Sequence, residues 1–213
     1  MRQRLTAPRA AGVAGILFAL LFGTSIVLLR TALDRSHDTH VWSGPDAAQI
    51  RFALNMIPYG GIAFLWFIGV IRDQLGDLED KLFATVFFGS GLVFLAMVFS
   101  SAAIAGGMLA AGEQLDATSA LEIITFARAE MLEITNVFAL RMAGVFMISL
   151  GTLWRRTGAM ATWTVILTYS LALTLILMIT LSLWVQLIFP AWTLLISVLI
   201  LLRSTRATMQ VDH

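Results

Sequence analysis

Residues 82–107 read LFATVFFGSGLVFLAMVFSSAAIAGG, a run without a single charged side chain. As an α-helix this run would be about 39 Å long at ~1.5 Å per residue, which exceeds the roughly 30 Å of hydrocarbon in a bilayer. Uncharged apolar runs long enough to cross the hydrocarbon also occur at 11–29 and 52–71. Because such runs are typical of membrane-spanning helices, they predict an all-α polytopic transmembrane bundle.

The composition of the whole chain agrees with this fold class. Of its 213 residues, 59% are hydrophobic and only 13% are charged, whereas about 25% are charged in typical soluble proteins. These values exclude a soluble globule and a disordered chain. The net charge of +1 offers no basic surface for nucleic acid, and the absence of cysteine excludes disulfides and thiolate metal sites.

The second half of the chain predicts three more spans, at about 131–154, 161–183 and 187–202. A single helix over 161–202 would be about 60 Å long, so it must turn, and the helix breakers lie at 182–190. We therefore expect one transmembrane domain, 1–213, with about six spans. Ser119 and Glu122 form a capping-box pattern, which predicts a helix that begins at Ala120 and continues into the fourth span.

The distribution of Lys and Arg predicts that both chain ends face the cytoplasm. With that orientation the inner segments hold nine cations and the outer segments four. The inner cations are Arg2, Arg4, Arg9, Arg72, Lys81, Arg155, Arg156, Arg203 and Arg206, and the outer ones are Arg30, Arg35, Arg51 and Arg128.

Small residues recur every four positions in two spans, at Ala11, Gly15, Ala19 and Gly23 and at 102–107. Such faces allow helix backbones to approach closely in lipid. They serve either packing within the chain or association with a second copy or another membrane protein, and packing within the chain is the simpler interpretation.

Arg141 is the most informative polar residue, because it lies ten positions into the fourth predicted span, where an arginine costs about 2.5–3.5 kcal/mol on insertion scales. We expect it to face protein or water. Glu133 is about 12 Å away along the same helix, so the second span offers better partners. We expect Arg51 to pair with Glu133, and Arg141 to donate to Asn55 and to the Leu54 carbonyl, which Pro58 deprives of its helical donor.

This intramembrane cluster of Arg51, Asn55, Glu133 and Arg141 has two interpretations. It is either a structural lock between two spans or the lining of a water-filled cavity in a small transporter or channel. The structural interpretation is favoured, since one cluster is thin support for transport. The chain contains no catalytic motif and no histidine within a span, so no cofactor is predicted.

Two loops carry weaker signals. His37 and His40 are three residues apart in the stretch 34–40, which also holds the carboxylates of Asp34 and Asp38. On a turn the two histidines could bind a transition metal, although an ordinary solvated loop is the simpler interpretation. The acidic stretch at 72–81 lacks the residue order of a calcium loop, and we interpret it as a connector rather than a catalytic site.

The stretch from Arg141 to Trp163, with Arg155, Arg156, Thr157 and Gly158 turning into the next span, resembles a segment of small multi-pass bacterial membrane proteins whose activities are not established. In those proteins the turn often continues with a Leu-Pro or similar pair, where this chain has Ala159 and Met160. The resemblance implies a bacterial inner-membrane location, and it does not indicate any particular activity. We therefore expect a non-catalytic structural or accessory membrane component, with a small transporter or channel as the alternative and an enzyme least favoured.

Overall fold

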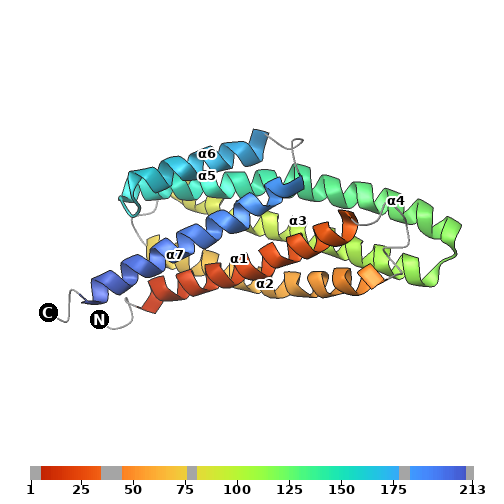
Figure 1. Cartoon of the computed structure of the whole chain (residues 1–213). Helices are drawn as coiled ribbons and strands as arrows, with labels where there is room; N and C mark the ends of the chain where they lie inside the picture. Colours follow the sequence, from red (N-terminus) through yellow and green to blue (C-terminus); the bar gives the residue numbers. More distant parts are fainter. Residues whose placement is uncertain (1–5, 35–44, 76–80, 178–182, 210–213) are drawn as a thin grey trace.

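The computed structural model describes residues 6–34, 45–75, 81–177 and 183–209, and all regular structure in these ranges is helical. The helices form one elongated bundle (Figure 1), which confirms the predicted all-α class. They are α1 (Thr6–Asp34), α2 (Pro45–Leu75), α3 (Lys81–Gln114), α4 (Ala117–Glu133), the π-helix η4 (Ile134–Ala139), α5 (Leu140–Thr157), α6 (Thr162–Leu177), the 3-10 helix η5 (Leu183–Leu187) and α7 (Ile188–Met209).

Among the described residues, five helical stretches are long and apolar enough to cross a membrane. They are Arg9–Ala32, Asp46–Asp73, Leu82–Gln114, Ala117–Thr157 and Trp184–Ser204. The protein is therefore a multi-pass membrane protein. Helix α6 is apolar but has only 16 residues, so the count of six spans stays a prediction. The beginning of α1 and the end of α7 lie at the same end of the bundle (Figure 1), as an even number of crossings requires.

The turn predicted within 161–202 falls between α6 and α7, and residues 178–182 lie outside the described part of the chain. Helix α7 begins at Ile188, close to the predicted start at 187, and Pro190 lies in its first turn. Proline is tolerated in the first turn of a helix because the N–H that it lacks has no partner there.

Helices α4, η4 and α5 form one continuous rod, as predicted for the fourth span, but the rod begins earlier than expected. The cap is Asp116 rather than Ser119, because the Asp116 carboxylate accepts hydrogen bonds from the backbone N–H groups of Thr118 and Ser119 at 3.2 and 3.1 Å. Hydrogen bonds from Ser119, first from its side chain and then from its backbone, lower the pKa of Asp116 below its ordinary value.

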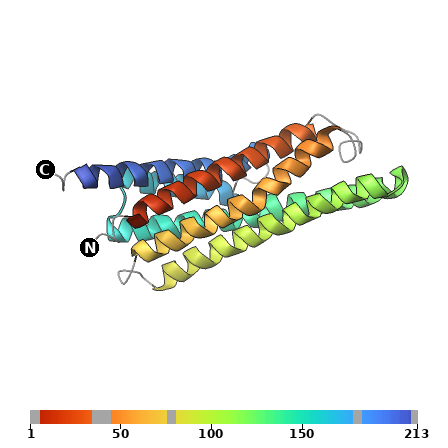
Figure 2. The same ribbon diagram turned by 90° about the horizontal axis from the view of Figure 1, so that it is seen from below.

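The last part of α3 and the first part of α4 extend past the ends of α1 and α2 (Figure 2). We call residues 105–133 the hairpin, the end of the bundle that carries it the hairpin end, and the opposite end the termini end. Along α4 the buried side chains are Ala120 and Ile124, which pack against α3 around Met108 and Leu109.

Three arginines mark the termini end. The guanidinium of Arg72 lies over the Phe88 ring at 4.9 Å, and that of Arg156 over the Phe83 ring at 4.8 Å. Arg203 donates a hydrogen bond of 2.6 Å to the Ala159 carbonyl, beside the left-handed residue Gly158 that ends α5. This end therefore carries cations on the helix termini of α2, α5 and α7.

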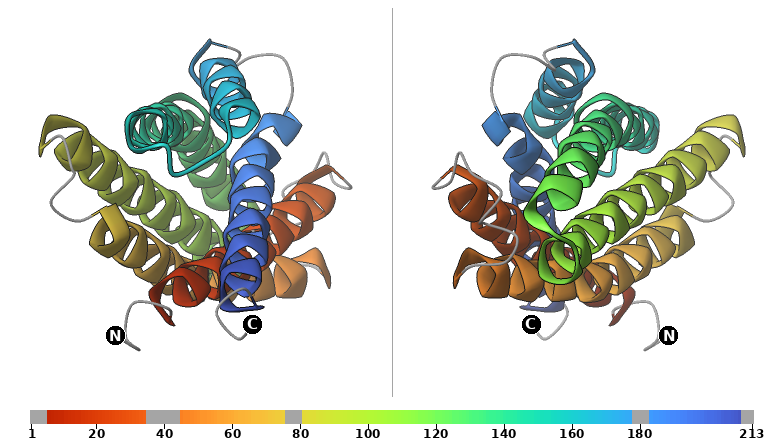
Figure 3. Two further views of the ribbon diagram at one scale, coloured as in Figure 1. Left: turned by 90° about the vertical axis from the view of Figure 1, so that its left-hand side faces the viewer. Right: turned by 90° about the vertical axis from the view of Figure 1, so that its right-hand side faces the viewer.

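Helix packing follows a simple order (Figure 3). Helix α1 packs against α2 and α7, α2 also packs against α3, and α5 packs against α3 and α6. The small-residue face of α1 is covered within the chain, because Ala11 and Ala19 are buried and Gly15 faces Ser197 of α7 and Phe67 of α2. Packing within the chain, the simpler of the two interpretations, is therefore confirmed for α1.

The bundle interior is filled by aromatic rings from five helices, which we call the aromatic core. Its central ring, Phe64 of α2, lies 4.7 Å from the ring of Phe18 and 5.4 Å from that of Phe146, measured between ring centroids. The members are Phe18, Phe22, Phe64, Phe67, Phe87, Phe94, Phe146, Trp154, Phe189 and Trp192. These rings pack against one another across the middle of the described bundle.

Candidate functional site: a polar cavity at the hairpin end

The predicted pairing of Arg51 is wrong. Its guanidinium forms an ion pair with Glu113 near the end of α3, and Glu133 is exposed on the rod. Helix α3 packs against both α2 and the rod, so it separates Arg51 from Glu133 (Figure 3). The sequence could not distinguish the two glutamates, because both lie near the hairpin end and only the packing order decides between them.

The predicted partners of Arg141 are also wrong. This arginine is exposed on the surface of α5, and one of its guanidinium nitrogens donates a 3.2 Å hydrogen bond to the Val137 carbonyl one turn earlier. Asn55 is exposed on α2 and lines a groove with Arg51. The side chain of Arg141 thus extends back toward the hairpin end, the direction in which a helical side chain leans.

A different set of polar residues surrounds a cavity of about 80 Å³ between α1, α2, α3, the rod and η5. At roughly 30 Å³ per water, the cavity has room for two or three water molecules. Most of its lining is apolar, from residues such as Phe22, Ile26 and Val98. The polar side chains on its wall are Ser25, Arg30, Ser101, Thr135 and Gln186.

The π-helix η4 supplies one wall of this cavity. The Met131 carbonyl, just before η4, accepts a hydrogen bond of 2.9 Å from the Thr135 hydroxyl and one of 3.3 Å from the Ser101 hydroxyl. The Ser101 and Thr135 oxygens are 2.6 Å apart, and because a hydroxyl has a single proton, Ser101 donates either to Thr135 or to the Met131 carbonyl at one time. A π-turn shifts the backbone hydrogen bonds of a helix by one residue, and such turns occur frequently at functional sites. These two hydroxyls therefore join α3 to the irregular turn of the rod.

A second contact fixes η5 against the π-helix. The Gln186 side-chain amide donates a 2.7 Å hydrogen bond to the Asn136 side-chain carbonyl. Gln186 is buried and lines the cavity, and Asn136 is partly buried. The pair closes the cavity on the side where α7 begins.

Arg30 is buried, with 6% of its surface exposed, unlike the other arginines whose side chains the structure describes. In the sequence Arg30 directly follows the uncharged run 11–29, a position typical of a charge that flanks a span. It is therefore one of the four cations predicted on the outer side. No pattern in the sequence marks it as buried, because its burial depends on how α1 packs against its neighbours. The geometry therefore moves the candidate site from Arg141 to Arg30.

The aromatic core limits what the cavity can do. Phe22 lines the cavity and its ring contacts Phe94 at 5.9 Å, and Phe94 in turn contacts Phe64 at 5.5 Å. These contacts connect the cavity wall to the centre of the aromatic core. The cavity is thus a small, mostly apolar recess at the hairpin end, with a few polar side chains on its wall that could hold water.

The remaining polar features are the hydroxyls of α6 and two loops, and much of the two loops lies outside the described residues. Three hydroxyls of α6, on Thr168, Ser170 and Thr174, donate to carbonyls of the preceding turn, a common arrangement for Ser and Thr within a helix. His37 and His40 fall within 35–44 and most of the acidic stretch within 76–80, so the structure does not describe them. Among the described residues no cluster of three or more potential metal ligands occurs.

The contact between Asn136 and Gln186 yields a testable expectation. In a double-mutant cycle with Asn136→Leu and Gln186→Leu, the coupling free energy should be about 0.6–1.7 kcal/mol, the range found for hydrogen bonds between membrane helices. The measurement is the free energy of unfolding in a mixed micelle. Thr125→Val, at an exposed hydroxyl that bonds only to its own helix, should be nearly neutral and serves as the control. Strict additivity of the two substitutions would contradict the contact.

No protein-family model matches the chain, and neither a curated protein nor a solved structure matches it.

Proposed function

We propose that this multi-pass membrane protein is a non-catalytic accessory component that binds a partner protein through its hairpin. The observation that carries the proposal is a pair of exposed apolar side chains on one face of α4, Phe126, which is 71% exposed, and Ile123, which is about half exposed and three residues earlier. Leu121 is also about half exposed, on another side of the same helix. Charged residues surround them, namely Glu122, Arg128 and Glu130, so this surface belongs outside the hydrocarbon.

In water an exposed Phe, Leu and Ile on one short helix are costly, and burying each would contribute about 1.5–3 kcal/mol. Contiguous apolar surface rimmed by polar groups is characteristic of protein interaction sites. Helix α4 contacts mainly α3 within the bundle, which leaves most of its circumference open. The partner that fits is a protein with an apolar recess, either a second copy of the chain or another membrane protein.

The rest of the proposal follows the sequence. The excess of cations on the termini end supports an orientation with both chain ends in the cytoplasm and the hairpin on the opposite side of a bacterial inner membrane. The absence of catalytic motifs supports a role without enzymatic activity or a cofactor. The alternative, a small transporter or channel, rests on the polar cavity beside Arg30, and the aromatic core below that cavity disfavours it.

The test is photo-crosslinking in membranes of the cell that makes the protein. A photoreactive residue at Phe126 or Ile123 should give one discrete adduct, and the same residue at Ile166, an exposed apolar position on α6, should give none. An adduct of twice the chain mass would identify the partner as a second copy. Identical patterns at Phe126 and Ile166 would refute the proposed interface.

A substitution sharpens this experiment. With the photoreactive residue at Ile123, Phe126→Ala should lower the adduct yield roughly tenfold, because a buried aromatic anchor contributes on the order of 1–2 kcal/mol or more to binding. Arg128→Ala is the matched control on the same helix and should change the yield little. Equal yields from both variants would show that Phe126 does not contact the partner.

A further inference from the structure

An open groove of about 450 Å³ lies between α2 and α3 at the hairpin end, on the outer surface of the bundle. Its floor consists of small side chains, among them Ala102, Ala103 and Ala110, together with Gly106. A Cβ atom added at Gly106 would meet nothing within 4 Å, so no part of the described chain covers this floor. The volume falls in the range of ligand sites, which is about 300–1,000 Å³.

The outer part of the groove is charged and its inner part is apolar. Arg51 and Glu113 line it and form their ion pair there, with side chains that are 55% and 46% exposed. Toward the middle of the bundle the lining changes to Pro58 and Phe99. A membrane-facing groove that is charged at one end and apolar at the other has the polarity of a phospholipid.

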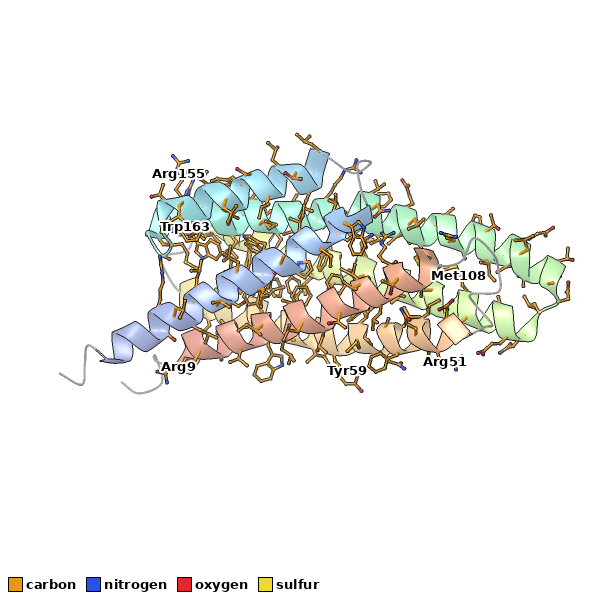
Figure 4. All side chains as sticks on the ribbon, viewed as in Figure 1. Arg9, Arg51, Tyr59, Met108, Arg155 and Trp163 are labelled. Carbon is orange, nitrogen blue, oxygen red and sulfur yellow. The ribbon has the colours of Figure 1, made fainter. Side chains whose placement is uncertain are left out.

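The two charges follow a definite order along the bundle axis. Ile50 packs in one cluster with Ala105 and Met108 of α3. The backbone of Arg51, the next residue, therefore lies at about the same level along the bundle axis. Glu113 is five residues beyond Met108, which places its backbone roughly 8 Å farther from the bundle centre. Figure 4 shows Arg51 and Met108 at the same end of the bundle, opposite Arg9 and Arg155. The cation therefore lies nearer the hydrocarbon and the anion farther out.

This order matches one class of headgroup. In a zwitterionic aminophospholipid the phosphate lies next to the acyl chains and the ammonium group lies farther out. Among the described residues Arg51 forms only its bond to Glu113, and a guanidinium has five N–H donors, so donors remain for a phosphate. The Glu113 carboxylate has several acceptor sites, which suit a primary ammonium group.

We propose that this groove binds a phosphatidylethanolamine-type lipid, with its phosphate at Arg51, its ammonium group at Glu113 and an acyl chain along Pro58 and Phe99. A lipid with a net negative headgroup would meet Glu113 without a compensating cation. A trimethylated headgroup would lack the N–H donors that the carboxylate can accept. The site thus selects the primary amine.

The probe is the purified full-length protein with dioleoyl lipids of defined headgroup, assayed by native mass spectrometry for bound lipid. Phosphatidylethanolamine should be retained about threefold more than phosphatidylcholine or phosphatidylglycerol, a ratio in the range expected for exposed charge pairs. Glu113→Gln should abolish the preference for ethanolamine over choline. Arg51→Gln should reduce the retention of both zwitterionic lipids.

The reversed pair Arg51→Glu with Glu113→Arg separates lipid recognition from a merely structural ion pair. It keeps an ion pair between α2 and α3, so the thermal stability should be retained, but it inverts the order of the charges and should abolish the ethanolamine preference. Glu130→Gln, on α4 and away from the groove, is the control and should retain the preference. An unchanged ethanolamine preference in the reversed pair would overturn the proposal. The proposal would also be overturned if two copies of the chain formed a dimer that keeps the lipid out of this groove, to the same extent with and without phosphatidylethanolamine.

Discussion

Gly15→Ala should destabilise the bundle by about 1–3 kcal/mol, the usual cost of overfilling a packed interior. A Cβ atom at Gly15 would collide with the Ser197 hydroxyl of α7 and would lie 2.8 Å from Cδ2 of Phe67 on α2. Since α1 is wedged between these two helices, it cannot move away from both. The gain in helix propensity from Gly to Ala, at most about 1 kcal/mol, is smaller than this cost. The measurement is the unfolding temperature of the purified protein, followed by tryptophan fluorescence.

Two companion variants make the Gly15 result specific. Ser197→Ala removes a buried hydroxyl to which the described residues supply no hydrogen-bond partner, so on its own it should be neutral or slightly stabilising. Combined with Gly15→Ala it should restore part of the lost stability, because it removes one of the two collisions. Gly89→Ala on α3, where an added Cβ would meet nothing within 4 Å, should not destabilise. A Gly15→Ala protein as stable as the parent would contradict this packing of α1 and α7.

Much of the fold could be predicted from the sequence, because each uncharged run is longer than the hydrocarbon is thick. The run 82–107 became the membrane-spanning part of α3, and the absence of a stop signal after Ser119 correctly indicated one rod into the fourth span. These features depend on local composition and on single helices. The cap at Asp116 was missed because a capping-box pattern three residues later was more conspicuous.

The candidate site could not be predicted, because it depends on which helices are neighbours. Arg51 pairs with Glu113 rather than Glu133 since α3 lies beside α2, and nothing in the sequence gives this order. The π-helix over 134–139 has the sequence ITNVFA, which reads as an ordinary helical segment. In the sequence Arg30 resembles a flanking charge, and only the packing of the helices shows that it is buried. Single-helix patterns therefore located the polar residues but not their partners.

Phe64→Ala should lower the stability of the bundle about as much as Gly15→Ala does, because it leaves a cavity in the interior rather than overfilling it. Phe64 is fully buried, and its ring contacts five others, those of Phe18, Phe67, Phe94, Phe146 and Phe189. In soluble proteins a Phe→Ala substitution at such a site costs about 3–5 kcal/mol. Part of that cost comes from returning apolar surface to water, and this part is absent in a bilayer, where separated helices already lie in hydrocarbon. The lost contacts and the cavity remain, so we expect about 2–3 kcal/mol.

The matched control is Phe52→Ala, on the same helix, at a side chain that is 59% exposed. It removes the same atoms from a surface that lipid can refill, so its unfolding temperature should stay within a degree or two of the parent. A large drop for Phe64→Ala together with no drop for Phe52→Ala would show that packing between rings, rather than hydrophobicity, stabilises this bundle. Equal effects from the two substitutions would contradict the aromatic core.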